Sequence, residues 1–449
     1  MIFRLAILYI VALAFFGWGM ATVQFGIFPW SFLGPVLKDM QAFAEGTAEE
    51  DTTLVGRIRN DMGLGSGRHG HNVAISLGDL APVSVEEGIF AGRAAPLFSS
   101  RLDDGHYLIQ GVFQFDGALH GTIVVDTNGR VVKTFPYIFP DKQRETEIRG
   151  NSHGFDIDRN GTLYVNTGEG VRAYDWCGDQ LWQARGAHHS ITLTDRKTLW
   201  HPQGNGMTER KARSGKPVRT FSNIDIIKAN PDAIFLTVLS RNNWNHERGN
   251  LEIAHFKEDP FHQNDVEALP AALADQYDLF EAGDLVISLR AVNAVFVIDP
   301  ETLKVKWSLA NVTDRQHDPE FIGDNKISIY DNRTHDGTES RIVIADTVTG
   351  ALETAYQDAE IFTTARGNHT PLADGSMLIV ASHRGMMIHV SPDGEVLTRF
   401  ANVIGPATAT KQAARIKLSG DERAFRILRI YNADYITNEQ FQDWEKQCA

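Results

Sequence analysis

Histidine residues recur along the chain at the start of successive sequence units. Near neutral pH an imidazole can attack as a nucleophile, transfer a proton, or bind a metal ion such as zinc or copper. A single histidine at such a position more often holds a turn by hydrogen bonding, but several at equivalent positions favour a shared chemical site. The positions are His153, the pair His188 and His189, His262, His317 and His369.

Each of these histidines is followed by short β-type runs separated by turns rich in Asp, Gly and Asn. The unit that begins at His153, for example, continues through a strand near Leu163 and ends at Trp182. An earlier unit begins near Leu102, which makes six. Units of roughly 30 to 50 residues with up to four short strands are typical of a β-propeller. We therefore predict an all-β, six-bladed propeller in which the histidines converge on the central channel.

The boundaries of this propeller follow from where the recurrence begins and ends. We expect a membrane anchor or signal sequence at 1–30, a connector at 31–89, the propeller at 90–401, and a closing strand with a short helix at 402–449. Residues 424–431 have a strand pattern that could close the ring. Thr437 and Gln440 form a plausible capping box for a helix over 438–447.

The N-terminal segment carries an uncharged apolar run over 5–23, long enough to cross a bilayer as a helix. Arg4 precedes this run and no Lys or Arg follows until Lys38. The positive-inside tendency then predicts a single-pass inner-membrane protein with its propeller in the periplasm. A cleaved signal peptide is the alternative, although the run is longer than a usual signal-peptide core.

Composition narrows the classes of partner. The chain has 449 residues and a formal net charge of −14, which argues against a nucleic-acid partner because phosphate binding needs a basic face. Cys177 and Cys448 have no metal-binding spacing, and from sequence a disulfide and two separate buried thiols are equally plausible.

One ordered set of motifs resembles the bacterial arylsulfotransferase family, and with its flanking blades the resemblance covers roughly residues 90 to 400. The motifs are HQNDVE at 262–267, LVISLRAVN at 285–293, Trp307, RQHDP at 315–319 and YDNR at 330–333. The resemblance implies a six-bladed propeller that transfers a sulfuryl group from an aryl sulfate to a phenolic acceptor. The transfer would proceed through a sulfated histidine, with no nucleotide sulfate donor, no cofactor and no metal.

The family's functional positions carry over to particular residues of this chain. The nucleophile falls on His317. The supporting catalytic groups fall on His262, Arg290 and His189, and a substrate-binding group falls on Asn264. His369, which begins the last unit, is a further candidate for substrate binding, although family members more often have another residue there. A guanidinium and protonated imidazoles suit the negative oxygens of a sulfuryl group in transfer.

Two other functions fit the same sequence. The propeller could be a non-catalytic, membrane-tethered scaffold of the cell envelope or a glycan-binding protein. The converging imidazoles could instead hold zinc or copper.

Overall fold

The computed structural model describes residues 80–84, 96–115, 118–138, 154–167, 170–233, 261–334, 339–404, 414–418 and 421–448. All of them lie in the second of two units into which the chain divides, Met1–Gly70 and His71–Ala449. The predicted membrane segment at 5–23 and the residue His153 lie outside these ranges and stay predictions. Within the described ranges, no helix has both the length and the apolar character needed to cross a membrane.

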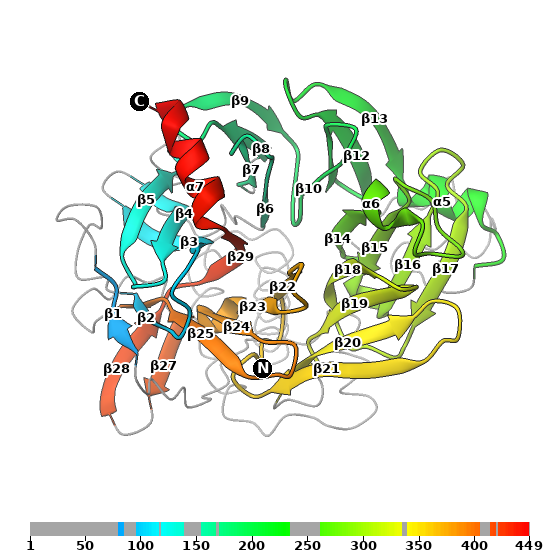
Figure 1. Cartoon of the computed structure of the whole chain (residues 1–449). Coiled ribbons are helices and arrows are strands. Elements are labelled where there is room, and N and C mark those ends of the chain that lie inside the picture. The colour runs from blue at the N-terminus through cyan, green and yellow to red at the C-terminus, as the bar shows by residue number, and fades with distance from the viewer. Residues whose placement is uncertain are drawn as a thin grey trace, which may run out of the picture. The chain divides into compact units, whose positions relative to one another are not determined.

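Six antiparallel blades surround a central axis, so the predicted all-β, six-bladed propeller is confirmed (Figure 1). Blades 2 to 5 each use four consecutive strands, and the first strand of each lies nearest the axis. Blade 2 contains β6 (Gly154–Ile157), β7 (Leu163–Asn166), β8 (Gly170–Tyr174) and β9 (Gln180–Arg185). Blade 3 contains β10 (Thr192–Leu193), β11 (Thr198–Pro202), β12 (Gly206–Lys211) and β13 (Pro217–Ser222).

The next two blades repeat this order. Blade 4 contains β14 (Gln263–Ala268), β15 (Leu285–Leu289), β16 (Ala294–Ile298) and β17 (Val305–Ala310). Blade 5 contains β18 (His317–Gly323), β19 (Lys326–Asp331), β20 (Ser340–Asp346) and β21 (Leu352–Asp358). Short 3-10 turns continue the second strands of blades 4 and 6, namely η3 (Arg290–Val292) and η4 (Ser382–Arg384).

The ring is closed by strands from both ends of the described chain. Blade 1 joins β3 (His106–Phe115), β4 (Ala118–Asp126) and β5 (Val131–Pro136) to the C-terminal strand β29 (Ile430–Ile436). Blade 6 contains β22 (Asn368–Pro371), β23 (Met377–Ala381), β24 (Met386–Val390) and β25 (Val396–Ala401). The N-terminal strands β2 (Leu97–Ser100) and β1 (Ala81–Pro82) extend blade 6 outward from β25.

The prediction that 424–431 closes the ring is wrong. The closing strand is β29, which pairs with β3 from Ile430 to Ile436. The first half of the predicted segment, 424–427, belongs to β28 (Asp421–Ile427), which pairs with β26 (Val403–Ile404) and β27 (Ala414–Leu418) in a separate sheet. Both segments have strand patterns, and the partner of a strand is a long-range choice that a local pattern does not specify.

Apolar packing between neighbouring blades stabilises the ring. The second strands of the blades are buried on both faces, as in β15, where all five residues are buried. One apolar cluster lies at each of the six interfaces between neighbouring blades. Between blades 3 and 4, for example, Trp200 and Met207 pack with Ile287 and Phe296. Burial at about 25 cal/mol per Å² of apolar surface makes these interfaces the main source of stability.

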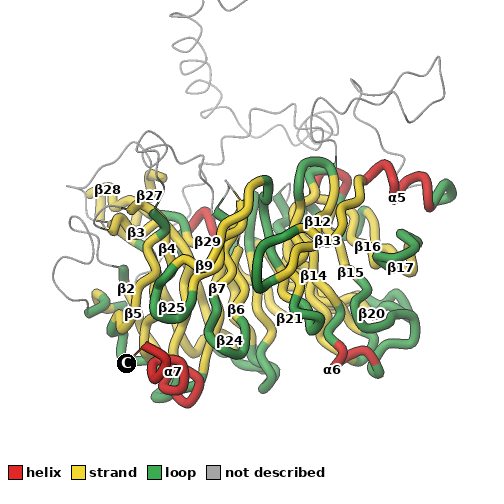
Figure 2. Tube along the Cα trace, turned by 90° about the horizontal axis from the view of Figure 1, so that it is seen from above, coloured by secondary structure: helices red, strands yellow, loops and turns green. Residues whose placement is uncertain are grey.

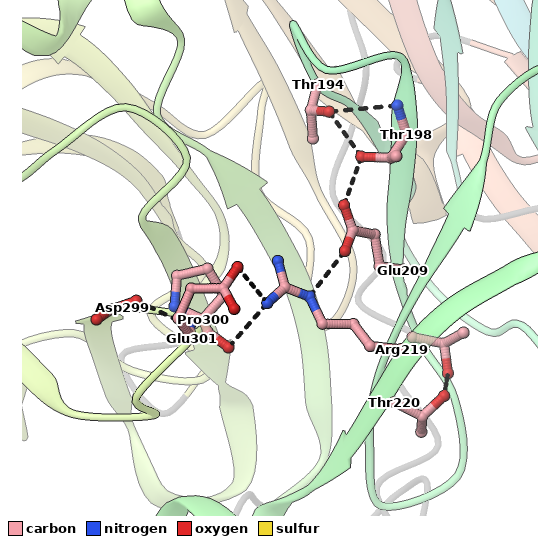
Figure 3. Close-up of polar contacts among 9 residues, drawn as sticks. Thr194, Thr198, Glu209, Arg219, Thr220, Asp299, Pro300 and Glu301 are labelled. Atoms are coloured by element: carbon pink, nitrogen blue, oxygen red, sulfur yellow. Dashed lines mark hydrogen bonds and ion pairs between the residues drawn. The ribbon is translucent and has the colours of Figure 1, made fainter.

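A polar network also joins blades 3 and 4 (Figure 3). Arg219 Nε donates to the buried carboxylate of Glu209 at 2.7 Å, and Glu209 accepts from Thr198 Oγ1 at 2.7 Å. The Arg219 guanidinium also reaches across to Glu301 at 2.7 Å and to the carbonyl of Pro300. The arginine therefore ties the outer part of blade 3 to a turn of blade 4.

The predicted C-terminal helix is confirmed as α7 (Asn438–Glu445), including the capping box between Thr437 and Gln440. The 3-10 turn η6 (Lys446–Cys448) follows it, and Cys448 forms a disulfide with Cys177 in blade 2, with a Cα–Cα distance of 5.3 Å. The structure thus decides between the two readings of the cysteines.

Figure 2 shows α7 and α6 (Ala271–Ala274) on one face of the propeller and α5 (Asn223–Ala229) on the other. Because α7 and α6 follow inner strands and α5 follows an outer strand, the inner strands begin on the α5 face and run toward the α7 face.

Candidate active site

A cavity of about 200 Å³ lies on the propeller axis, where the inner strands of the blades face one another. Its walls come from β6, β14, β18, β22 and β29, and from the segments that precede β10 and β22. Three of the residues predicted from sequence line it directly, namely His189, Asn264 and His317. The channel predicted from the recurring histidines is therefore the candidate site.

The hydrogen bonds of His317 fix which ring nitrogen carries the proton. Nδ1 lies 2.7 Å from Asn332 Oδ1 and 3.0 Å from the carbonyl oxygen of Arg315. The Asn332 amide cannot be reversed, because its Nδ2 donates to the carbonyls of Thr363 and Arg366. Both neighbours of Nδ1 are acceptors, so Nδ1 is the protonated nitrogen. Nε2 keeps the lone pair and accepts a hydrogen bond from the main-chain N–H of Arg366 at 3.0 Å.

The surroundings of His317 keep its imidazole neutral. Burial, the Arg290 guanidinium and His262 hold the pKa of His317 well below its usual range, and the bond to Asn332 opposes them only in part. A neutral imidazole with its lone pair on Nε2 is the nucleophilic form of histidine.

The other predicted catalytic residues gather around His317 from blades 3 and 4. The ring centroids of His189 and His262 are 5.1 Å apart and nearly perpendicular. Arg290 opens η3, and its main-chain N–H donates to the carbonyl of His262 at 3.2 Å. The structure thus brings His189, His262 and Arg290 together beside His317, as the resemblance implied.

Asn264 also belongs to this group. It is buried and lines the cavity, and its Nδ2 donates to the carbonyl of Gln316 at 2.9 Å. Its Oδ1 has no hydrogen-bond partner among the described residues, which leaves an acceptor for a ligand.

His369 lies apart from this group. It does not line the cavity, and both ring nitrogens are bonded, Nδ1 to Asp318 Oδ2 at 2.9 Å and Nε2 to Ser328 Oγ at 2.8 Å. Burial lowers its pKa to about 3, so the ring is neutral. The structure therefore places His369 behind Asp318 rather than against a substrate.

Several site residues have left-handed main-chain conformations, which are uncommon for residues with a side chain. Positive φ angles occur at His189, His262, Asp318 and Arg366, with values from 46° to 65°. Such conformations cost about 1–3 kcal/mol each and cluster at functional sites, where the surrounding structure enforces them. Here they occur where the chain enters an inner strand.

Two rings of equivalent residues line the channel beyond His317. Each blade contributes one residue to the first ring and, two positions along the same strand or the segment entering it, one to the second. The first ring contains Gly154, Ser190, Asp265, Asp318, Asn368 and Asn432. The second ring contains Asp156, Thr192, Glu267, Glu320, Thr370 and Asp434.

Burial raises the pKa of the carboxyl groups in these rings. It raises the pKa of Asp156 and of Asp318 to about 7 and that of Asp434 to about 6. Burial and neighbouring carboxyls raise the pKa of Asp265, Glu267 and Glu320 well above the usual range, and Asp265 shares a hydrogen bond with Asp318. Carboxyl groups that retain protons near neutral pH therefore line the same channel as His317. Within the described residues, no three His, Cys, Asp or Glu side chains are arranged to hold a metal ion.

The raised pKa of Asp434 in the second ring predicts that Asp434→Asn stabilises the protein in a pH-dependent way. The folded carboxyl titrates near pH 6, against 3.8 for its ordinary value, so the folded state binds more protons between these values and stability falls as pH rises through them. Two units correspond to at most about 3 kcal/mol. Asparagine keeps the oxygen that accepts from the Tyr435 N–H. We expect the variant to gain up to this amount at pH 8 and almost nothing at pH 4, measured by urea unfolding.

The exposed Asp103→Asn is the matched control, and it should change stability equally little at both pH values. An equal gain for Asp434→Asn at pH 4 and pH 8 would show that burial does not raise this pKa.

Sequence reasoning assigned no role to several residues that the structure places at the site. Asn332 lies in the YDNR motif at 330–333, but the sequence does not show that its side chain bonds to His317. Arg366, Ser382 and Tyr431 line the cavity from blades 6 and 1 and carry no motif. The carboxyls of the second ring could have been found by aligning the inner strands of the six units.

Together these features define a class of protein: a six-bladed propeller whose axial cavity brings a buried, neutral histidine together with a second imidazole and a guanidinium group. The sequence model of the arylsulfotransferase (ASST) family matches residues 168–402, more than half of the chain. The chain belongs to this family, as the motifs predicted. None of the curated proteins matches the chain.

Solved structures similar to the chain are distant. A protein of unknown function from Bacteroides caccae is 12% identical, with 66% of this chain and 93% of that chain covered and a TM-score of 0.43. A streptogramin B lyase is 11% identical, with 82% and 96% covered and a TM-score of 0.40. TolB from Acinetobacter baumannii is 12% identical, with 74% and 66% covered and a TM-score of 0.40. At these TM-scores the likenesses carry no inference about function.

Proposed function

We propose that the protein is an aryl-sulfate sulfotransferase that uses His317 as its nucleophile. The observation that carries this proposal is the fixed tautomer of His317, which lines the cavity: Nδ1 is held by Asn332 and Arg315, and Nε2 keeps its lone pair and accepts from the main-chain N–H of Arg366. Family membership supports a sulfotransferase in general, and the cavity supports an anionic substrate.

The transfer takes two displacements. In the first, Nε2 of His317 attacks the sulfur of an aryl sulfate, the bond from sulfur to the aryl oxygen breaks, and the phenolate leaves with a proton from a neighbouring acid. In the second, a phenolic acceptor gives up its proton, its oxygen attacks the same sulfur, and the N–S bond breaks to release the sulfated acceptor and the neutral histidine. Splitting the reaction in this way means that donor and acceptor need not occupy the small cavity together.

The surrounding residues have separate roles in this scheme. Arg290, with His262 and His189, stabilises negative charge on the sulfuryl oxygens, and Oδ1 of Asn264 accepts a hydrogen bond from the hydroxyl of the phenolic acceptor. A histidine of this group also exchanges the proton with the phenol, and the carboxyls of the channel can resupply it. His369 positions Asp318 and so shapes the wall of the channel.

We propose the same location as the sequence predicted, with the propeller in the periplasm and 5–23 as its inner-membrane anchor. The disulfide between Cys177 and Cys448 supports an oxidising compartment, because thiols in the cytosol are kept reduced.

The function is tested by incubating the full chain, purified in detergent, with 4-nitrophenyl sulfate in the presence and absence of phenol. We expect release of 4-nitrophenol that depends on added phenol. Without phenol, intact-mass measurement should show one added sulfuryl group per chain, and peptide mapping should place it on His317. Folded protein that shows neither release nor adduct with several aryl sulfates would favour the scaffold or glycan-binding alternative.

A further inference from the structure

Arg366 lies beside His317 in the wall of the cavity, on the blade 6 side of the channel. It falls between β21 and β22, has a φ of 65°, and lines the cavity. Its guanidinium carbon lies 5.6 Å from the centre of the Tyr431 ring. Burial lowers its pKa to about 10, so the side chain remains charged at neutral pH.

This charge has no counter-ion in the part of the chain that the structure describes. None of the ion pairs found there includes Arg366, and its Nη1 makes no hydrogen bond there. Its side chain interacts with the Tyr431 hydroxyl, which is a neutral group and does not balance the charge. A buried charge without a partner is costly, so such a group usually marks a place for an anionic ligand.

Ser382 supplies a second observation on the same wall. It opens η4, which contacts β29, and it occupies in blade 6 the position that Arg290 occupies in blade 4. Its side chain is fully buried and lines the cavity, yet Oγ has no hydrogen-bond partner among the described residues. This wall therefore carries two hydrogen-bond donors, the Arg366 guanidinium and the Ser382 hydroxyl, that can bind an anionic acceptor.

The main chain holds this wall at a fixed place relative to the nucleophile. The N–H of Arg366 donates to Nε2 of His317, while its carbonyl accepts from Asn332, which also binds Nδ1 of His317. The next residue must be glycine, because it has a φ of 137° and a Cβ there would lie 2.6 Å from the Tyr330 ring. Main-chain hydrogen bonds and the glycine that follows therefore hold the segment of Arg366 against the His317 imidazole.

We infer that Arg366 and Ser382 form a second anion-binding wall, which binds terminal oxygens of the sulfuryl group from the blade 6 side of the channel. The inference rests on the proposed function and names a substrate-binding element of that site. When Nε2 bonds to sulfur, it can no longer accept from the Arg366 N–H. A sulfuryl oxygen on the same sulfur then takes over that donor, so the resting contact becomes part of the anion site.

The test measures binding separately from transfer. Benzenesulfonate has three terminal oxygens on sulfur and no aryl–oxygen bond to break, and benzenesulfonamide is its uncharged counterpart. Arg366→Gly removes the guanidinium but keeps the N–H and suits the positive φ. By calorimetry on the full chain, we expect it to weaken benzenesulfonate binding about 10- to 100-fold, as expected for the loss of a charged hydrogen bond. Binding of benzenesulfonamide should change little.

Further variants separate this role from folding. Arg366→Lys keeps the charge and should restore part of the affinity, whereas Ser382→Ala should weaken binding about 3- to 10-fold. Arg399→Gln is the matched control, since Arg399 lies in blade 6, pairs with Glu360 at 3.0 Å and does not line the cavity. It should bind benzenesulfonate as the wild type does.

The possible outcomes distinguish this inference from the proposed function. Arg366-dependent binding of benzenesulfonate without any sulfuryl transfer would support the anion wall and reject the transferase. Active transfer, together with unchanged benzenesulfonate affinity and unchanged kcat/KM in folded Arg366→Gly, would reject the wall and leave the transferase in place. Failure of the wild type to bind benzenesulfonate would also overturn the inference.

Discussion

His317→Ala is expected to lower the rate of sulfuryl transfer by roughly 10³-fold or more, as is usual when a covalent nucleophile is removed. Nε2 of His317 is the unprotonated nitrogen of a neutral ring, and its position is fixed by Asn332 and by the main chain of Arg366. Neither a methyl group nor water at that place can form the sulfated intermediate. The measurements are the rate of 4-nitrophenol release and the intact mass after incubation with the donor alone.

The loss must be separated from a loss of fold, because His317 is buried and its neighbours would be left with unmatched bonds. His389→Ala is a suitable control. His389 is also a buried histidine with two bonded nitrogens, to Tyr107 and Ser376, but it lies within blade 6 and does not line the cavity. We expect both variants to lose stability, and only His317→Ala to lose the adduct and the turnover. Turnover that survives in folded His317→Ala would assign the nucleophile elsewhere.

The recurrence in the sequence was sufficient to predict the blades. Each unit begins with a polar pair, continues with short apolar strands and ends at an aromatic residue, and the observed sheets follow the same units. The strand from Leu285 to Leu289 and that from Ala294 to Ile298 are both continuous apolar runs because they are covered on both sides by neighbouring blades. Local pattern and burial therefore agree for the parts of the fold that repeat.

The closure of the ring could be predicted only in outline. The strand pattern of 424–431 predicts the closing strand there, whereas the strand that pairs with β3 is Ile430–Ile436. Equivalence between blades would have helped, because Asn432 and Asp434 repeat the spacing of Gly154 and Asp156 in the channel. The deciding information is the position of a side chain around the axis, not the strand pattern.

The residues of the candidate site also fall into those that a sequence motif predicts and those that it does not. Residues on the blade 3 to 5 wall, such as His262 and His317, stand in motifs and were predicted. Arg366 and Ser382 stand in loops without a motif, and they reach the cavity only because the ring brings blade 6 round beside blade 1. His369 shows the opposite case. It stands at an equivalent position in its unit, yet its ring turns away from the cavity to bond Asp318 and Ser328.

Removing the disulfide by the double substitution Cys177→Ser and Cys448→Ser is expected to lower the free energy of unfolding by about 2–5 kcal/mol. The bond joins residues 271 positions apart, so it restricts the unfolded chain strongly. In the folded state it fixes η6 to blade 2, directly after the helix that follows the closing strand of blade 1. The bond therefore stabilises the junction at which the ring closes.

Other contacts hold the same helix and limit the loss. Trp444 of α7 packs on Trp176 with ring centroids 4.8 Å apart, and Glu445 accepts from the Trp176 indole at 2.7 Å. Because these contacts remain, we expect the double variant to fold and to unfold at lower urea concentration, with a steeper slope because its unfolded state is less compact. Wild-type protein unfolded in a thiol reductant should match the variant, and the reductant should not change the variant further. Equal stability of variant and oxidised wild type would show that α7 is held by its packing alone.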